Sequence, residues 1–412
     1  MVYTGSMRTV SKVYYFFTPY TDGRERAVAR FFKGLAERSN KKRTKTRLDG
    51  LLQQDIAVIN LWTEYRYKGY KYLDKATRKQ LYANLRLIEA DFDDFYARFR
   101  SSAAGPEKPL LIRALMAYFS PARGVYQYRE SSSFGRLLRD PSQKKLVGDC
   151  NQIVTLYIHL YSRYYDAADL RIRALPNHVA LHHDGLDIET TNGTIAQYGK
   201  HRLLPVAAIV SINLLDTTDS YLATHEIAPE DFLQASRFAF ILSHDRDIAT
   251  HNLKAAYGKL VNSLMERHDY KQALRFAVQS RDRGLLGVAG HNGAVYEMRR
   301  HDYAAARRYA KHAAKQAELT KSSWQAEGAH HYQNHRYHDA IKAFKHLGDQ
   351  KLIRQCYEAL FFAEQAKLGS NLTVNSLMQQ AGTVKRMRTY AKKSGNKKLA
   401  RYADSLSEHL KG

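Results

Sequence analysis

The stretch that decides the fold runs from residue 148 to residue 193 and reads GDCNQIVTLYIHLYSRYYDAADLRIRALPNHVALHHDGLDIETTNG. Apolar side chains follow Cys150 at offsets of 4, 7 and 11, which is the spacing of one helix face. Cys150 then lies in the first turn, where unpaired N–H groups and the positive end of the helix dipole favour a thiolate. Gly148 would permit the tight turn into the helix, and the N–H of Cys150 could donate to an oxyanion. We therefore expect Cys150 to be a reactive thiol.

The second half of this stretch predicts a β-hairpin. Alternating runs flank the pair Asp184-Gly185, which is the strongest short-range indication of a hairpin turn. With this pair as the turn, Glu189 becomes a diagonal neighbour of His178 on the same face of the sheet. A carboxylate beside an imidazole holds its tautomer and stabilises the imidazolium. We expect Glu189 to serve His178 in this way, and Asp187, which faces the same way nearer the turn, is the alternative acid.

Three short motifs resemble those of the bacterial transglutaminase-like superfamily of papain-like cysteine enzymes: GDC at 148–150, NHV at 177–179 and IETTNG at 188–193. The resemblance implies that Cys150 is the nucleophile, that His178 is the base, and that Glu189 replaces the usual Asp. It also implies attack on an amide or ester carbonyl through a thioester, followed by transfer to water or to an amine. Because transfer to an amine requires that water be excluded, we favour hydrolysis of a peptide or side-chain amide.

Three other side chains are candidates to stabilise an oxyanion: Gln152, Tyr126 and Tyr128. Each has a plainer alternative, because a glutamine there can satisfy the first helical turn and a tyrosine can pack in a core. Cys150 has one too, since a cysteine on an apolar helix face is often a packing residue.

A short motif recurs in the second half of the chain. It reads RHDY at 267–270, RHDY at 300–303 and NHRY at 334–337, and an alanine follows each tyrosine by three residues. The motifs are almost equally spaced, and the sequence between them is helical in pattern. The motif and its period, which is close to the repeat of about 34 residues that such units have, resemble tetratricopeptide repeats. The resemblance implies pairs of helices with a concave surface for a protein or peptide partner.

Four regions follow from these patterns. We expect residues 1–105 to form a helical N-terminal region, with apolar stripes such as that at positions 81, 85, 88 and 92. The transglutaminase-like domain would cover residues 106–225, and the tetratricopeptide-like array residues 245–370. Residues 371–412 would form a basic C-terminal helix or tail. The expected fold class is α+β, with a papain-like, transglutaminase-type domain flanked by a helical N-terminal region and an all-α repeat array.

The composition limits the other classes of function. The 412 residues carry a net charge of +25, which attracts polyanions, but no recognised nucleic-acid motif accompanies the basic stretches 41–47 and 385–398. A nucleic-acid partner is therefore the less favoured reading. Two cysteines cannot form a disulfide framework, which favours a cytoplasmic location, and no apolar run reaches the ~20 residues of a membrane helix. The adjacent histidines at 182–183 and 330–331 lack further ligands at zinc spacing, so we expect no metal and no cofactor.

The sequence therefore predicts a thiol-dependent hydrolase with the triad Cys150, His178 and Glu189, and with repeats that recruit a protein partner. The alternative is a non-catalytic scaffold, in which the repeats bind the partner and the transglutaminase-like domain is structural.

Overall fold

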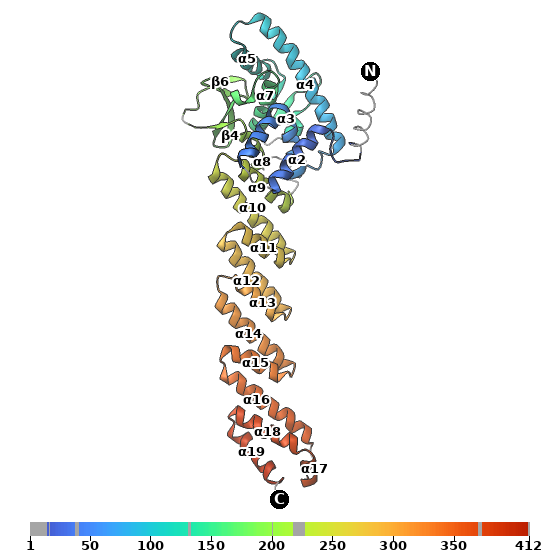
Figure 1. The fold of residues 1–412 in the computed structure, drawn as a ribbon, viewed down its shortest axis with the longest axis vertical. Helices are drawn as coiled ribbons and strands as arrows, with labels where there is room; N and C mark the ends of the chain where they lie inside the picture. The colour runs from blue at the N-terminus through green and yellow to red at the C-terminus, as the bar shows by residue number, and fades with distance from the viewer. Residues whose placement is uncertain are drawn as a thin grey trace. The chain divides into compact units, whose positions relative to one another are not determined.

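The computed structural model describes residues 15, 17–37, 41–130, 133–199, 201–216, 227–369 and 373–410, and it divides into two compact units, Met1–Lys259 and Leu260–Gly412 (Figure 1). The first unit is mixed α+β and the second is a helical, repeat-like array. Residues 1–14 of the predicted N-terminal region, and several side chains of the basic stretch 41–47, lie outside the described residues. Among the helices that are described, none is long and apolar enough to cross a membrane.

Four helices come first among the described residues of the first unit. They are α2 (Gly23–Glu37), α3 (Lys41–Tyr67), α4 (Lys75–Ser102) and α5 (Glu107–Phe119). The side chain of Asp74 caps α4 by accepting a hydrogen bond from the N–H of Thr77 at 2.7 Å. The predicted stripe of α4 is buried along its whole length, which confirms that this helix is held by hydrophobic packing: Leu81, Leu85, Ile88 and Phe92.

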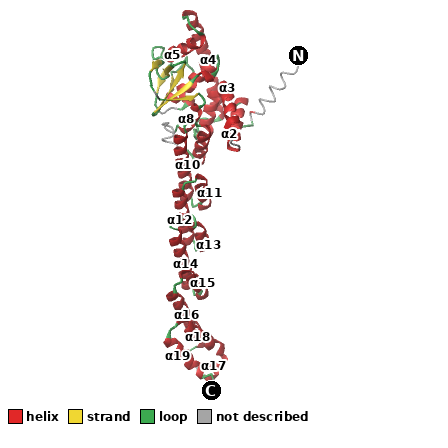
Figure 2. Ribbon diagram, turned by 60° about the vertical axis from the view of Figure 1, so that its left-hand side comes forward, coloured by secondary structure: helices red, strands yellow, loops and turns green. Residues whose placement is uncertain are grey.

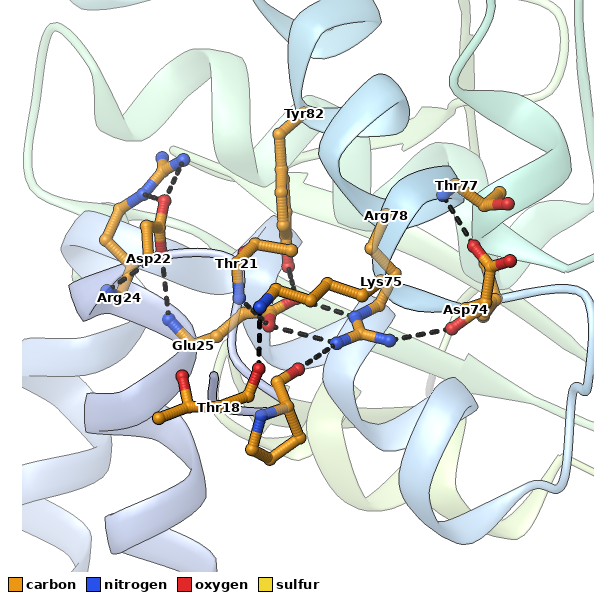
Figure 3. A network of polar contacts seen from close by, with 12 residues as sticks. Thr18, Thr21, Asp22, Arg24, Glu25, Asp74, Lys75, Thr77, Arg78 and Tyr82 are labelled. Atoms are coloured by element: carbon orange, nitrogen blue, oxygen red, sulfur yellow. Dashed lines mark hydrogen bonds and ion pairs between the residues drawn. The ribbon is translucent and has the colours of Figure 1, made fainter. Parts of the chain in front are cut away.

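A buried ion pair ties the start of α2 to α4. Arg78 and Glu25 are both 0% exposed, and Nε of Arg78 donates to Oε1 of Glu25 at 2.8 Å. The guanidinium also donates to the backbone carbonyls of Pro19 and Leu73, and the hydroxyl of Tyr82 donates to the Glu25 carboxylate (Figure 3). Both charges are therefore hydrogen-bonded on several sides, which is the condition under which a protein interior tolerates an ion pair.

A five-stranded antiparallel sheet with the order β6-β5-β4-β3-β7 lies in the same unit (Figure 2). Its strands are β3 (Arg171–Leu175), β4 (His178–His183), β5 (Leu186–Glu189), β6 (Thr194–Ala196) and β7 (Arg202–Pro205). His182 is paired with Asp187 across the hairpin. Asp184 and Gly185 have φ values of 45° and 82°, as a type I′ turn requires. The predicted hairpin and its register are confirmed.

The helix that carries Cys150 is buried on every side. It is α7 (Cys150–Ser162), and it follows β1 (Tyr126–Tyr128), α6 (Phe134–Leu137) and β2 (Leu146–Gly148), with β1 and β2 paired in parallel. Every residue of α7 from Gln152 onward is buried, because the helix contacts β4 as well as α3, α5 and α8 (Ala208–Leu215). The predicted apolar face is thus part of a helix that is buried all round. A short η1 (Ala167–Asp169) and α9 (Pro229–Leu242) complete the unit.

The second unit consists of successive helices, each in contact with the next. After α10 (Arg246–Glu266), which crosses the boundary between the units, they are α11 (Tyr270–Ser280), α12 (Arg283–Arg299), α13 (Tyr303–Ala310), α14 (Gln316–Gln333), α15 (Tyr337–Leu347) and α16 (Gln350–Gln365). Each motif tyrosine is the first residue of its helix, and the histidine two residues before it has a positive φ: His268 (59°), His301 (63°) and His335 (58°). The recurring motif therefore marks the same left-handed turn three times.

Small residues let the paired helices approach closely. The motif alanines are completely buried, at positions 273, 306 and 340. Gly328 on α14 faces α15, where a Cβ would lie 2.3 Å from the ring of Phe344. The chain continues through η2 (Ala366–Leu368), α17 (Val374–Gln379), α18 (Ala381–Ser394) and α19 (Lys397–Glu408), with a core that includes Val384 and Met387.

Candidate active site

Cys150 lies where β2 runs directly into α7. The side chain of Asp149 caps the helix by accepting from the N–H of Gln152 at 3.1 Å. Gly148 has no left-handed backbone angle that would require glycine, but a Cβ there would be tightly packed, at 3.1 Å from Leu137 and 3.3 Å from Gln152. Cys150 is 8% exposed. The structure thus places the thiol in the first helical turn, just below the surface.

His178 and Glu189 meet across the β4–β5 hairpin. Nε2 of His178 lies 2.7 Å from Oε2 of Glu189. The other carboxylate oxygen accepts from the N–H of Thr191 at 3.0 Å and from its hydroxyl at 2.5 Å, and the hydroxyl of Tyr198 donates to Oε2. Burial alone would raise the pKa of Glu189, but the hydrogen bonds from His178, Thr191 and Tyr198 outweigh it and lower the pKa to about 2. Glu189 is therefore a carboxylate at every physiological pH.

The imidazole of His178 joins the thiol to this carboxylate. Interaction with the nearby Cys150 thiol, followed by the hydrogen bond to Glu189, outweighs the effect of burial and raises the pKa of His178 to about 10. The His178 side chain is 27% exposed, whereas that of Glu189 is 11% exposed. The imidazole thus lies between the Cys150 thiol, with which it interacts, and the buried Glu189 carboxylate, to which it is hydrogen-bonded.

Asp187, the alternative acid, has other partners. Its Oδ1 accepts from Nε of Arg173 at 2.8 Å and lies 2.8 Å from Nδ1 of His182, while Oδ2 accepts from the N–H of Tyr198 at 3.2 Å. Its partners are therefore residues other than His178. The separation of the two carboxylates follows from the register, because Asp187 lies directly opposite His182.

The three oxyanion candidates have different surroundings. The hydroxyl of Tyr126 donates to the carbonyl of Gly148 at 2.7 Å, so it supports the strand pair β1–β2. The Gln152 side chain is 0% exposed, and its carbonyl accepts from Asn60 on α3 at 3.1 Å. Tyr128 is 48% exposed and is paired with Gly148, two residues before the thiol. Burial, and then electrostatic interaction with the nearby Cys150, raise the pKa of its hydroxyl. Tyr128 is thus the most exposed of the three candidates, and it interacts electrostatically with Cys150.

Two further contacts near the site were not predicted from the sequence. Tyr198 follows β6 and donates to Glu189, although nothing in its local sequence distinguishes it from the chain's other tyrosines. The amide of Asn151, next to Cys150, donates to Asp216 at 3.2 Å, and Asp216 lies 3.9 Å from Nζ of the buried Lys68. The second contact ties the first turn of α7 to the end of α8, which Asp216 caps.

Within the described ranges, no three His, Cys, Asp or Glu side chains gather in a way that could hold a metal ion. Comparison with protein-family models, with curated proteins and with solved structures found no match to this chain.

Proposed function

We propose that this protein is a thiol-dependent hydrolase that cleaves a peptide or side-chain amide. The observation that carries the proposal is the imidazole of His178, which is hydrogen-bonded to the buried Glu189 and interacts with Cys150 at the start of α7. A cation beside a thiol at a helix N-terminus favours the nucleophilic thiolate. The motifs that resemble the transglutaminase-like, papain-like superfamily support the same assignment.

The reaction would proceed in two stages. Sγ of Cys150 forms a bond to the carbonyl carbon, and the resulting oxyanion is stabilised by the N–H of Cys150 and by the hydroxyl of Tyr128. The C–N bond then breaks, His178 gives its proton to the leaving amine, and a thioester remains. In the second stage His178 accepts a proton from water as the water attacks the thioester, and the thiolate leaves. Glu189 orients the imidazole and stabilises its cationic form throughout.

The helical array would recruit a protein or peptide partner. Its support is the recurrence of one turn and one helix pairing at almost equal intervals along the chain, in a pattern that resembles tetratricopeptide repeats. Stacked helix pairs of this kind present an extended surface that is suited to binding a chain. Recruitment and thiol chemistry are separable parts of the proposal.

Hydrolysis of p-nitrophenyl acetate by the 412-residue chain tests the chemistry. We expect Cys150 to be acetylated much faster than Cys356, whose thiol pKa is raised to about 11 by burial, and we expect the acetyl group to turn over. Cys150→Ser should abolish turnover with little change in melting temperature, whereas Cys356→Ser should retain it. His178→Ala should slow both acylation and release.

The scaffold alternative makes the opposite prediction for the same assay. Acetylation of Cys150 no faster than that of Cys356, or an acetyl group that never turns over, would count against a hydrolase. A large loss of stability in Cys150→Ser would assign the residue to packing.

A further inference from the structure

The three left-handed turns of the second unit share a histidine and a tyrosine whose rings lie close together. In the second and third turns the histidine Nδ1 lies 2.9 Å and 2.8 Å from the tyrosine hydroxyl. The ring centres within the three pairs are 6.3, 6.0 and 5.9 Å apart: His268 with Tyr270, His301 with Tyr303, and His335 with Tyr337. Each turn therefore presents two adjacent rings to whatever lies beside it.

In the first turn, the next long helix covers the pair with a ring of its own. Tyr296 on α12 stacks on His268 with ring centres 5.2 Å apart and an interplanar angle of 20°, and it lies 4.7 Å from the ring of Tyr270. Asp282 caps the N-terminus of α12, and Tyr296 lies in the last turns of that helix.

The second turn is covered in the same way. His330 on α14 stacks on His301, with ring centres 4.1 Å apart and an interplanar angle of 28°. Its ring centre lies 6.0 Å from that of Tyr303. Two different residue types thus fill the same place, and what they share is a planar ring.

In the third turn, the corresponding residue is an alanine. Asp349 caps α16 as Asp282 caps α12, and when the two helices are aligned on these caps, Ala363 matches Tyr296. An open pocket of about 730 Å³ lies there, and its lining includes His335 and Tyr337 of the turn together with Ala363. The pocket lies where the first two turns hold Tyr296 and His330.

Further lining residues indicate what the pocket would accept. Tyr332 and Phe362 are 39% and 53% exposed and add two more aromatic rings to its walls. Among the described residues that line the pocket, Glu358 is the only carboxylate, and none is Lys or Arg. Aromatic walls favour a planar or cationic group, and a single carboxylate favours a positive charge beside it.

We propose that this pocket binds an aromatic side chain of an extended peptide, with a Lys or Arg next to it in the peptide. The partner's ring takes the place that Tyr296 and His330 fill in the preceding turns. This inference deepens the recruiting role proposed above for the second unit and rests on it, but it is independent of the thiol chemistry.

Binding can be measured on the 412-residue chain with labelled alanine methyl groups. We expect Ac-Lys-Trp-Lys-NH2 to cause saturable upfield shifts of the Ala359 and Ala363 methyl signals, because a ring would lie over them. Ac-Lys-Leu-Lys-NH2 has the same charge without the ring, and Ac-Glu-Trp-Glu-NH2 has the ring with the opposite charge; both should bind at least tenfold more weakly. Equal binding of the leucine peptide, or no saturable shift, would overturn the proposal.

A variant that fills the pocket from within provides a second test. Ala363→Tyr restores the ring found in the earlier turns, so we expect a higher unfolding midpoint and at least tenfold weaker binding of the tryptophan peptide. Ala304→Tyr adds a ring at an exposed alanine outside the pocket and should change neither. Unchanged binding by Ala363→Tyr would refute the site.

The two proposals can fail separately. Cys150→Ser should bind the peptide as the parent protein does, so loss of turnover says nothing against the pocket. If an authentic partner is captured equally well by the parent protein and by Ala363→Tyr, recruitment stands and the pocket proposal falls.

Discussion

Replacing Glu189 with glutamine should uncouple the imidazole of His178 from its acid while keeping the shape of the side chain. The carboxylate accepts hydrogen bonds from His178, from the N–H and hydroxyl of Thr191, and from the hydroxyl of Tyr198. An amide nitrogen in place of Oε2 would face Nε2 of His178 and the hydroxyl of Tyr198, and it could accept a hydrogen bond from neither. The imidazole could meet it only with an unprotonated Nε2, which leaves the ring neutral with its proton on Nδ1.

The size of the effect follows from the pKa of His178. Its value of about 10, against an ordinary 6.5, corresponds to ~5 kcal/mol between the two protonation states. Cys150 and Glu189 share this stabilisation, so Glu189→Gln should lower the pKa of His178 by roughly 1–2 units. Each pKa unit weakens the imidazolium–thiolate pair tenfold relative to the neutral imidazole–thiol pair, so alkylation of Cys150 at pH 6 should slow by up to about 10- to 100-fold.

The assay is the pH dependence of alkylation by iodoacetamide, with Cys150 and Cys356 quantified separately by mass spectrometry. Asp187→Asn is the matched control, because Asp187 pairs with Arg173 and not with His178. It should lower the unfolding free energy by about 1–3 kcal/mol and leave the Cys150 profile unchanged. The reasoning is refuted if Asp187→Asn shifts the profile as far as Glu189→Gln does.

The same substitution should change how stability depends on pH. The pKa of Glu189 is depressed from 4.5 to about 2, so its contribution is present above pH 4.5 and is lost as the pH falls through 2. The pKa of His178 is raised, so its contribution is present below pH 6.5 and is lost as the pH rises through 10. Both contributions are fully present between pH 4.5 and pH 6.5. In urea unfolding, the difference in unfolding free energy between the parent protein and Glu189→Gln should therefore be largest in that range. An identical acid slope in the two proteins would contradict this account.

Two packing features give further predictions. Glu25→Ala should cost about 3–5 kcal/mol of unfolding free energy, because it leaves Arg78 buried and unpaired. The double variant Glu25→Leu with Arg78→Met should recover most of this loss. A double variant as unstable as Glu25→Ala would contradict the prediction. Gly328→Ala should cost about 1–3 kcal/mol because its Cβ would overlap the ring of Phe344. Gly258→Ala, in a helix and with nothing near its Cβ, should instead gain about 0.5–1 kcal/mol. Chemical denaturation measures all four variants.

The parts of the site that the sequence predicts are those fixed by local rules. The Asp184-Gly185 turn sets the pairing of the next residues on both strands, so it also sets which carboxylate reaches His178. Likewise, the cap at Asp149 fixes where α7 begins, and therefore which turn holds Cys150. In each case a few adjacent residues determine the geometry.

The parts that it misses depend on contacts between distant segments. Lys68 and Asp216 lie far apart in the chain, and no periodicity links them, yet they support the turn next to Cys150. The partner of Gln152 could not be predicted from helix spacing. Because α7 is buried on every side, the position of Gln152 two residues after Cys150 does not show which neighbouring element its side chain contacts. The contact of Tyr198 with Glu189 likewise depends on the path of a loop after β6.

The hairpin holds His178 and Glu189 only eleven residues apart, whereas Cys150 arrives on a separate helix. A hairpin pairs within about 1–10 μs and needs few distant contacts. The half of the site that handles protons is therefore encoded in one short continuous segment, and the nucleophile is encoded in another. A library restricted to residues 178–189 could retune proton transfer by exchanging a single oligonucleotide cassette, with the thiol and its helix left as they are.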